Sequence, residues 1–200
     1  MIKPQNIHCL ALNFTGVGNQ EEIPLYFVKS LSALCFSGAV VPYPENSESM
    51  WTEVELGIVV SEECRNIEPE DAVNFIEGYT ICADITCKNQ YSRDHHLGFS
   101  KSREHFCPVM DSIVKLRPEE LPDLKMTTEI DGKVTQLGYL REMKYDALKS
   151  LSFISKITVL KKGDIILTGT PKGVENNIIR SGNKIKQTIE KIGSIEYDIL

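Results

Sequence analysis

The sequence lacks three features that would each define a class of protein. None of its six cysteines forms a Cys-x-x-Cys pair, and no apolar run approaches the roughly 20 residues of a membrane span. Residues 1–12 contain neither the basic region nor the long apolar stretch of a signal peptide. We therefore expect free thiols rather than a disulfide scaffold, no membrane partner and a cytoplasmic protein.

Clustered positive charge is also scarce. The chain has 22 Lys and Arg against 28 Asp and Glu, and its densest basic run is the pair Lys161-Lys162. Phosphate contacts need a clustered basic surface, so we expect no nucleic-acid partner. A negatively charged chain favours a cation as ligand, and an anionic substrate would then need that cation or a local lysine to offset repulsion.

The residues that are present predict one domain, residues 1–200, of the α+β class and predominantly β. Asp131-Gly132 lies between two β-like runs and predicts a two-residue hairpin. Helices are expected at Glu70–Glu77, with Gly78 as the C-terminal cap, and at Tyr145–Ile157. A barrel or folded sheet would protect the strand edges. The other predicted strands are Ile7–Leu12, Leu25–Lys29, Glu53–Val60, Tyr79–Ile85, Ile165–Thr168 and Ser194–Ile199.

Two glutamates stand out in the segment Glu53–Val60 (EVELGIVV). Strand alternation places Glu53 and Glu55 on the same face of an otherwise apolar run. If that face is enclosed, basic partners or a hard cation must relieve the repulsion between the carboxylates. The plainer alternative is an edge strand with both glutamates in water.

A third carboxylate, Asp84, interrupts the apolar segment Gly78–Thr86 (GYTICADIT) near its end. From there it could reach into a pocket, or it could cap the turn into Thr86–Gln90. Together with Glu53 and Glu55 it would form half of a coordination shell for Mg²⁺ or Mn²⁺, which favour the same oxygen ligands. The four histidines show no spacing typical of a zinc site.

The segment Gly163–Val174 (GDIILTGTPKGV) is a buried strand followed by a tight polar exit. It lacks the phosphate-loop pattern, and its threonines could simply satisfy the local backbone. The three segments in this order resemble the fumarylacetoacetate hydrolase family, especially its small members that act on acylpyruvates and oxaloacetate. The resemblance runs from about Leu10 to the C-terminus, and Gly163–Val174 is its most specific match.

The resemblance implies a β-roll or β-clip fold, like the C-terminal domain of that family, and a homodimer. It also implies Mg²⁺ or Mn²⁺ on Glu53, Glu55 and Asp84, and a small-molecule 2-oxo acid as substrate. The reaction would be acylpyruvate C–C cleavage or oxaloacetate decarboxylation; the alternatives are an isomerase or hydratase of the same family, or an inactive homologue that binds metal or oxo acid. By resemblance, the catalytic residues are Lys101 and Thr170, and the substrate-binding residues are Lys29, Lys88, Gln90 and Gly169.

The segment Ala11–Val17 departs from the family pattern. Members of this size open with Arg-Asn-Tyr-x-x-His and a following glutamate, and the His/Glu pair activates water. Here Leu12 stands at the arginine position and Val17 at the histidine position. Valine neither accepts nor donates a proton, so the usual water activation cannot operate. An active enzyme would rely on the metal alone, or on another base such as Glu22 or His105.

Overall fold

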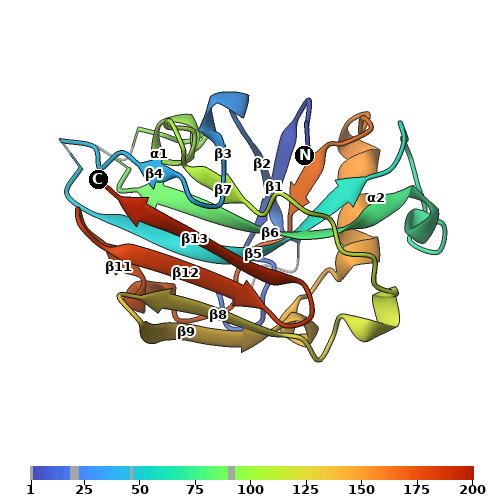
Figure 1. The fold of residues 1–200 in the computed structure, drawn as a ribbon. Coiled ribbons are helices and arrows are strands. Elements are labelled where there is room, and N and C mark those ends of the chain that lie inside the picture. The colour runs from blue at the N-terminus through green and yellow to red at the C-terminus, as the bar shows by residue number, and fades with distance from the viewer. Residues whose placement is uncertain (1, 19–22, 46, 90–92) are drawn as a thin grey trace.

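The computed structural model describes residues 2–18, 23–45, 47–89 and 93–200. Their strands form an eight-stranded and a five-stranded sheet, the latter in front in Figure 1. The larger sheet has the order β2-β1-β10-β5-β6-β7-β3, with β11 also paired to β5. Its strands are β1 (Ile7–Ala11), β2 (Leu25–Lys29), β3 (Leu34–Phe36), β5 (Met50–Val60), β6 (Ile76–Cys87), β7 (Cys107–Val109), β10 (Ile165–Leu167) and β11 (Ile178–Ile179).

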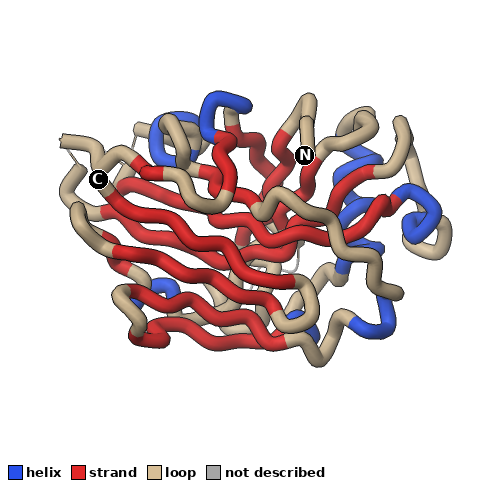
Figure 2. The backbone as a smooth tube through the Cα atoms, in the orientation of Figure 1, coloured by secondary structure: helices blue, strands red, loops and turns tan. Residues whose placement is uncertain are grey.

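The smaller sheet has the order β4-β13-β12-β8-β9. Its strands are β4 (Val40–Val41), β8 (Lys125–Ile130), β9 (Lys133–Tyr139), β12 (Lys184–Ile189) and β13 (Gly193–Ile199). The two sheets meet through apolar side chains and through a buried polar contact between the hydroxyls of Thr52 on β5 and Tyr197 on β13, 2.6 Å apart. Figure 2 shows how little of the chain is helical, which confirms the predominantly β fold.

The antiparallel pair β5–β6 runs through the centre of the larger sheet. Its register extends from Met50 opposite Cys87 to Val59 opposite Gly78. The alternate residues Val54 and Ile58 are completely buried, as expected for an interior strand. Gly57 allows the close packing here, because a Cβ at this position would lie 2.6 Å from Cys82 Sγ.

The main helix, α2 (Ala147–Ile157), confirms the prediction for Tyr145–Ile157 apart from its first two residues. Asp146 caps its N-terminus by accepting a hydrogen bond from the Lys149 N–H at 2.9 Å. The other helix, α1 (Gly98–Lys101), is a single turn. No helix among the described residues is long and apolar enough to cross a membrane.

The predicted hairpin is confirmed, since Asp131 (φ 51°) and Gly132 (φ 77°) form the two-residue turn between β8 and β9. The predicted helix at Glu70–Glu77 is wrong. A short 3₁₀ helix covers Ala72–Phe75, and β6 begins at Ile76. Ile76 pairs with Val60 of β5, and the Ser61 N–H donates to the carbonyl of Phe75 at 2.9 Å, so pairing with residues outside the stretch overrides the local helix signal.

All six cysteines are buried and free, as the sequence predicts. They pack as small buried side chains rather than as cross-links.

Candidate metal centre

The three carboxylates predicted to bind a cation meet on one face of the β5–β6 pair. Glu53 lies directly opposite Asp84 in the register, and Glu55 follows Glu53 on the same face. One oxygen from each carboxylate lies within 4.8 Å of the others. Glu55 and Asp84 are each 1% exposed. The alternatives of an edge strand in water and of a turn-capping Asp84 are therefore wrong, because β5 and β6 are interior strands.

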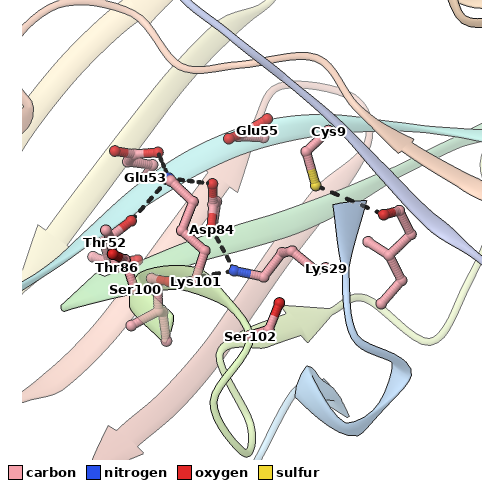
Figure 3. A network of polar contacts seen from close by, with 12 residues as sticks. Cys9, Lys29, Thr52, Glu53, Glu55, Asp84, Thr86, Ser100, Lys101 and Ser102 are labelled. Atoms are coloured by element: carbon pink, nitrogen blue, oxygen red, sulfur yellow. Dashed lines mark hydrogen bonds and ion pairs between the residues drawn. The ribbon is translucent and has the colours of Figure 1, made fainter. Parts of the chain in front are cut away.

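Two lysines from distant elements hold Asp84 (Figure 3). Lys29 at the end of β2 places its Nζ 2.5 Å from Asp84 Oδ1, and Lys101 at the end of α1 places its Nζ 2.5 Å from Asp84 Oδ2. Lys101 Nζ also lies 3.1 Å from Glu53 Oε2 and donates to Thr86 Oγ1 at 2.9 Å. Both lysines are buried.

Glu55 is the carboxylate whose negative charge has the fewest compensating contacts. It accepts a short hydrogen bond from the backbone N–H of Gly169, and it forms no salt bridge with any described residue. Burial raises the pKa of Glu55 well above its ordinary value, and the neighbouring charges of Asp84 and Glu53 raise it further. A proton or a cation is therefore favoured at this carboxylate.

The pKa shifts of the other charged groups of the centre depend on which oppositely charged neighbours they contact. Burial raises the pKa of Glu53, with Asp84 adding to the shift and Lys101 opposing it. Burial also opposes ionisation of Asp84, but Lys101 and Lys29 outweigh it and lower the pKa of Asp84. Burial alone would lower the pKa of Lys101, yet Asp84 and Glu53 raise it, so this ammonium stays charged.

The donor set fits a hard divalent cation. All three groups offer carboxylate oxygens. An all-oxygen donor set is typical of Mg²⁺ and Mn²⁺ sites, whereas zinc sites usually contain nitrogen and sulfur ligands. Three buried carboxylates face only two ammonium groups, which leaves one negative charge without a partner in the described centre. A dication would compensate that charge.

The loop after β10 completes the centre. Thr168 donates both its N–H and its hydroxyl to the carbonyl of Leu56, and Asn13 Nδ2 donates to the carbonyl of Thr168 at 2.9 Å. These contacts fix Gly169 at φ 87°, where its N–H points at Glu55 and a Cβ would lie 3.1 Å from the carbonyl oxygen of Leu10.

A cavity of about 240 Å³ opens beside the carboxylates. Its polar lining includes Glu53, Glu55, Thr86, Lys101, Gly169 and Thr170. The rest is mainly apolar and includes Leu10, Ala11, Leu12, Val17, Trp51 and Leu97. The structure thus brings the segment that departs from the family pattern into the same cavity as Glu53 and Glu55.

Only some of the predicted catalytic and substrate-binding residues line the cavity. Gly169 lines the cavity, as do the predicted catalytic residues Lys101 and Thr170. Lys29 contacts Asp84 and is not among the described residues that line the cavity. Lys88 is also outside the cavity lining, because its half-exposed side chain pairs with Glu48.

None of the remaining predicted residues, Gln90 and the two alternative bases, is among the described residues that line the cavity. Gln90 and the alternative base Glu22 lie outside the described residues. The other alternative base, His105, lies close to the carbonyl of Val40 through Nδ1, at 2.7 Å, and does not line the cavity. Among the described lining residues there is no imidazole.

Sequence reasoning assigned no role to two residues that complete the polar part of the site. Trp51 donates its indole N–H to Glu53 Oε1 at 2.9 Å, and Thr86 accepts from Lys101. Both lie on the same face as the carboxylates, two residues from Glu53 and from Asp84. Strand alternation could therefore have identified them.

The fold and its carboxylate centre agree with one family. The model of the fumarylacetoacetate (FAA) hydrolase C-terminal family matches residues 7–200, and the chain belongs to this family. The family and fold class predicted from the motifs are thereby confirmed.

Relatives support a role as an enzyme that acts on a 2-oxo acid. A mitochondrial oxaloacetate tautomerase of Oryza sativa subsp. japonica is 32% identical over 183 residues, which cover 88% of this chain and 80% of the relative. The structure of a 2-hydroxyhepta-2,4-diene-1,7-dioate isomerase from Mycobacterium marinum superposes with a TM-score of 0.90 at 32% identity, covering 100% of this chain and 75% of that one.

A fumarylpyruvate hydrolase from Pseudomonas aeruginosa, solved in complex with Mn²⁺ and pyruvate, shares the fold. Its TM-score is 0.89 at 19% identity, and the match covers 100% of this chain and 91% of that chain.

Proposed function

We propose that this chain is a divalent-metal-dependent enzyme that interconverts the keto and enol forms of a 2-oxo acid. The observation that carries the proposal is the buried set of Glu53, Glu55 and Asp84 beside a cavity that also exposes Lys101. The related tautomerase and isomerase support this class of reaction, and the Mn²⁺–pyruvate complex of a protein with the same fold supports the kind of ligand.

Mg²⁺ or Mn²⁺ on the three carboxylates would act as a Lewis acid toward the carboxylate and keto oxygens of a 2-oxo acid. Enolisation breaks a C3–H bond. The proton passes to a solvent water, the C–H electron pair forms the C2–C3 double bond, and the π pair of the carbonyl moves onto the keto oxygen. Lys101 stays protonated and lines the cavity, so its ammonium stabilises the negative charge that develops there. The hydroxyl of Thr170, held by a hydrogen bond from Gln136 Nε2 at 3.2 Å, orients the substrate carboxylate.

Val17 favours some of the reactions of this family over others. C–C hydrolysis of an acylpyruvate needs an activated water, and the described lining contains Val17 where the family pattern has a histidine. Decarboxylation of oxaloacetate requires a stabilised enolate, and proton transfer next to the keto group requires in addition only a solvent water as proton acceptor, not an activated nucleophile. We therefore place keto–enol interconversion first, with decarboxylation and acylpyruvate cleavage measured beside it.

The test follows exchange of the C3 protons for deuterium by NMR, with oxaloacetate and a short acylpyruvate as substrates. We expect exchange in at least one of these two acids that depends on Mg²⁺ or Mn²⁺, stops with EDTA and falls by roughly 100-fold or more in Glu53→Gln. Glu63→Gln, which alters an exposed salt bridge to Lys161, is the matched control and should keep the exchange rate. Exchange that ignores both the metal and Glu53 would refute the proposal. Tight metal and oxalate binding without any exchange would leave a binding protein instead.

Homodimerisation stays a prediction from the family resemblance. Light scattering on the purified protein gives its molar mass directly; a mass of one chain, 22.5 kDa, would contradict it.

A further inference from the structure

We infer that the preferred acid carries a single carboxylate and a short apolar tail, and that Leu12 and Val17 select it against acids with a second carboxylate. The inference rests on the proposed function, since it assumes that the carboxylate and keto groups bind at the metal centre. It adds the chemistry of the remainder of the substrate.

The wall that would contact the tail is apolar. Leu10, Leu12 and Val17 line the cavity from the end of β1 and the turn that follows, and Leu97 lines it from the residue before α1. Burial of methylene groups against such a wall strengthens binding by roughly fourfold for each methylene. The polar side chains of Asn89 and Ser100 also line the cavity, but both already donate to Asp94. A tail carboxylate would therefore lose its water there without a cationic partner.

The charge balance also favours one carboxylate. Lys101 is the only cation among the described residues that line the cavity, and its ammonium already contacts Glu53 and Asp84. Three carboxylates, the ammonium groups of Lys101 and Lys29 and one dication leave a single positive charge, which one substrate carboxylate neutralises. The stretches outside the described residues contain no lysine, arginine or histidine that could supply another.

The apolar wall is built into the fold. Asn13, next to Leu12, donates from its amide group to the carbonyls of Tyr145 and Thr168 and accepts from the Tyr145 N–H at 2.8 Å. Leu12 sits at φ 61°, and its side chain packs so closely over Gly18 that a Cβ there would lie 2.5 Å from Leu12 Cδ2. The position of Leu12 is therefore set before any ligand binds.

The size of the cavity limits the tail. Pockets for drug-sized ligands occupy roughly 300–1,000 Å³, whereas this cavity measures about 240 Å³. A tail of a few carbons fills this space.

The experiment measures binding by calorimetry to the Mg²⁺-loaded protein, with oxalate and pyruvate as ligands for the metal centre. The decisive pair is 2-oxopentanoate and 2-oxoglutarate, which differ by a terminal methyl against a carboxylate. We expect 2-oxopentanoate to bind more tightly than pyruvate, and more tightly than 2-oxoglutarate by about tenfold or more. Equal or tighter binding of 2-oxoglutarate overturns the inference and leaves the proposed function intact. If neither oxalate nor pyruvate binds, the proposed function fails as well.

Variants of Leu12 and Val17 test whether these two residues cause the preference for 2-oxopentanoate. Leu12→Arg should reverse the preference toward 2-oxoglutarate, and Val17→Arg is a second route to the same result if the first variant does not fold. Val134→Arg adds the same charge at an exposed apolar position on β9 and should leave the preference unchanged. An unchanged preference in folded Leu12→Arg and Val17→Arg proteins overturns the assignment.

Discussion

Glu53 of β5 lies directly opposite Asp84 of β6 in the antiparallel register. Like charges at facing positions of a sheet destabilise it, and here both strands are interior. Lys101 relieves the repulsion, because its Nζ contacts both carboxylates, at 3.1 Å and 2.5 Å. The fold thus tolerates a charge arrangement that would otherwise oppose it, and the arrangement is the one a divalent cation needs.

Lys101→Met should test this compensation. Removing the ammonium leaves Glu53 and Asp84 facing each other in a buried site, so we expect the metal-free protein to lose about 3 kcal/mol of stability. Thermal or urea unfolding in EDTA measures the loss, and Mg²⁺ should restore part of it. Lys161→Met, which breaks the exposed pair with Glu63, should cost less than about 1 kcal/mol. Equal losses in the two variants would mean that Lys101 has no special role.

The pH dependence of stability should report on Glu55. The pKa of Glu55 is raised in the folded protein above its ordinary value of 4.5, so its contribution to stability is present below pH 4.5 and is lost as pH rises through the raised pKa. Asp84 acts in the opposite sense: its pKa is lowered, and its contribution is lost only as pH falls below about its ordinary value of 3.8.

Glu55→Gln removes the ionisation of Glu55 and keeps an acceptor for the Gly169 N–H. In EDTA we therefore expect this variant to lose less stability than the parent between pH 5 and pH 8, and to be the more stable of the two at pH 8. It should also lose the stabilisation by Mg²⁺ that the parent shows most strongly at high pH. Melting temperatures across this range, with and without Mg²⁺, give both results. If the variant and the parent show the same pH profile, ionisation of Glu55 is not the cause of the loss of stability at high pH.

Gly169→Ala should weaken metal binding through the backbone. A Cβ at φ 87° is strained and would lie 3.1 Å from the carbonyl oxygen of Leu10, which shifts the N–H away from Glu55. Gly182→Ala is a close control, because Gly182 has φ 88° and nothing within 4 Å of the added Cβ. Both variants should lose roughly 1 kcal/mol of stability, and only Gly169→Ala should also lose roughly tenfold in Mg²⁺ affinity. Calorimetric titration with Mg²⁺ distinguishes them.

Val17→His should add the imidazole that the described cavity lining lacks. Because Val17 lines the cavity together with Glu53, the new side chain would be able to activate water beside the substrate. We expect acylpyruvate cleavage to rise by about 100-fold, the usual lower range for a general base. Loss of the enol absorbance measures cleavage, and Val17→Asn controls for polarity alone. Similar rates in the two variants would show that water activation needs more than this position.

Much of the fold could be read from local pattern. Alternation in Glu53–Val60 placed both glutamates on one face, and Asp131-Gly132 predicted its hairpin, because both signals depend on near neighbours in the chain. The prediction failed at Glu70–Glu77, where pairing of Ile76 with Val60 of β5 draws the end of the stretch into β6.

The sequence by itself determined the family, the strand pattern and the three carboxylates, since each is a property of adjacent residues. Only the tertiary structure decided how those carboxylates are balanced and what faces them. Lys29 lies 55 residues from Asp84 in the chain, and three strands separate β2 from β6 in the sheet order, so the curl of the sheet is what brings the two side chains into contact. Val17 reaches the cavity because β1 pairs with β10, whose following loop carries Gly169. Such contacts depend on sheet order, which is a long-range property that no local stretch of sequence contains.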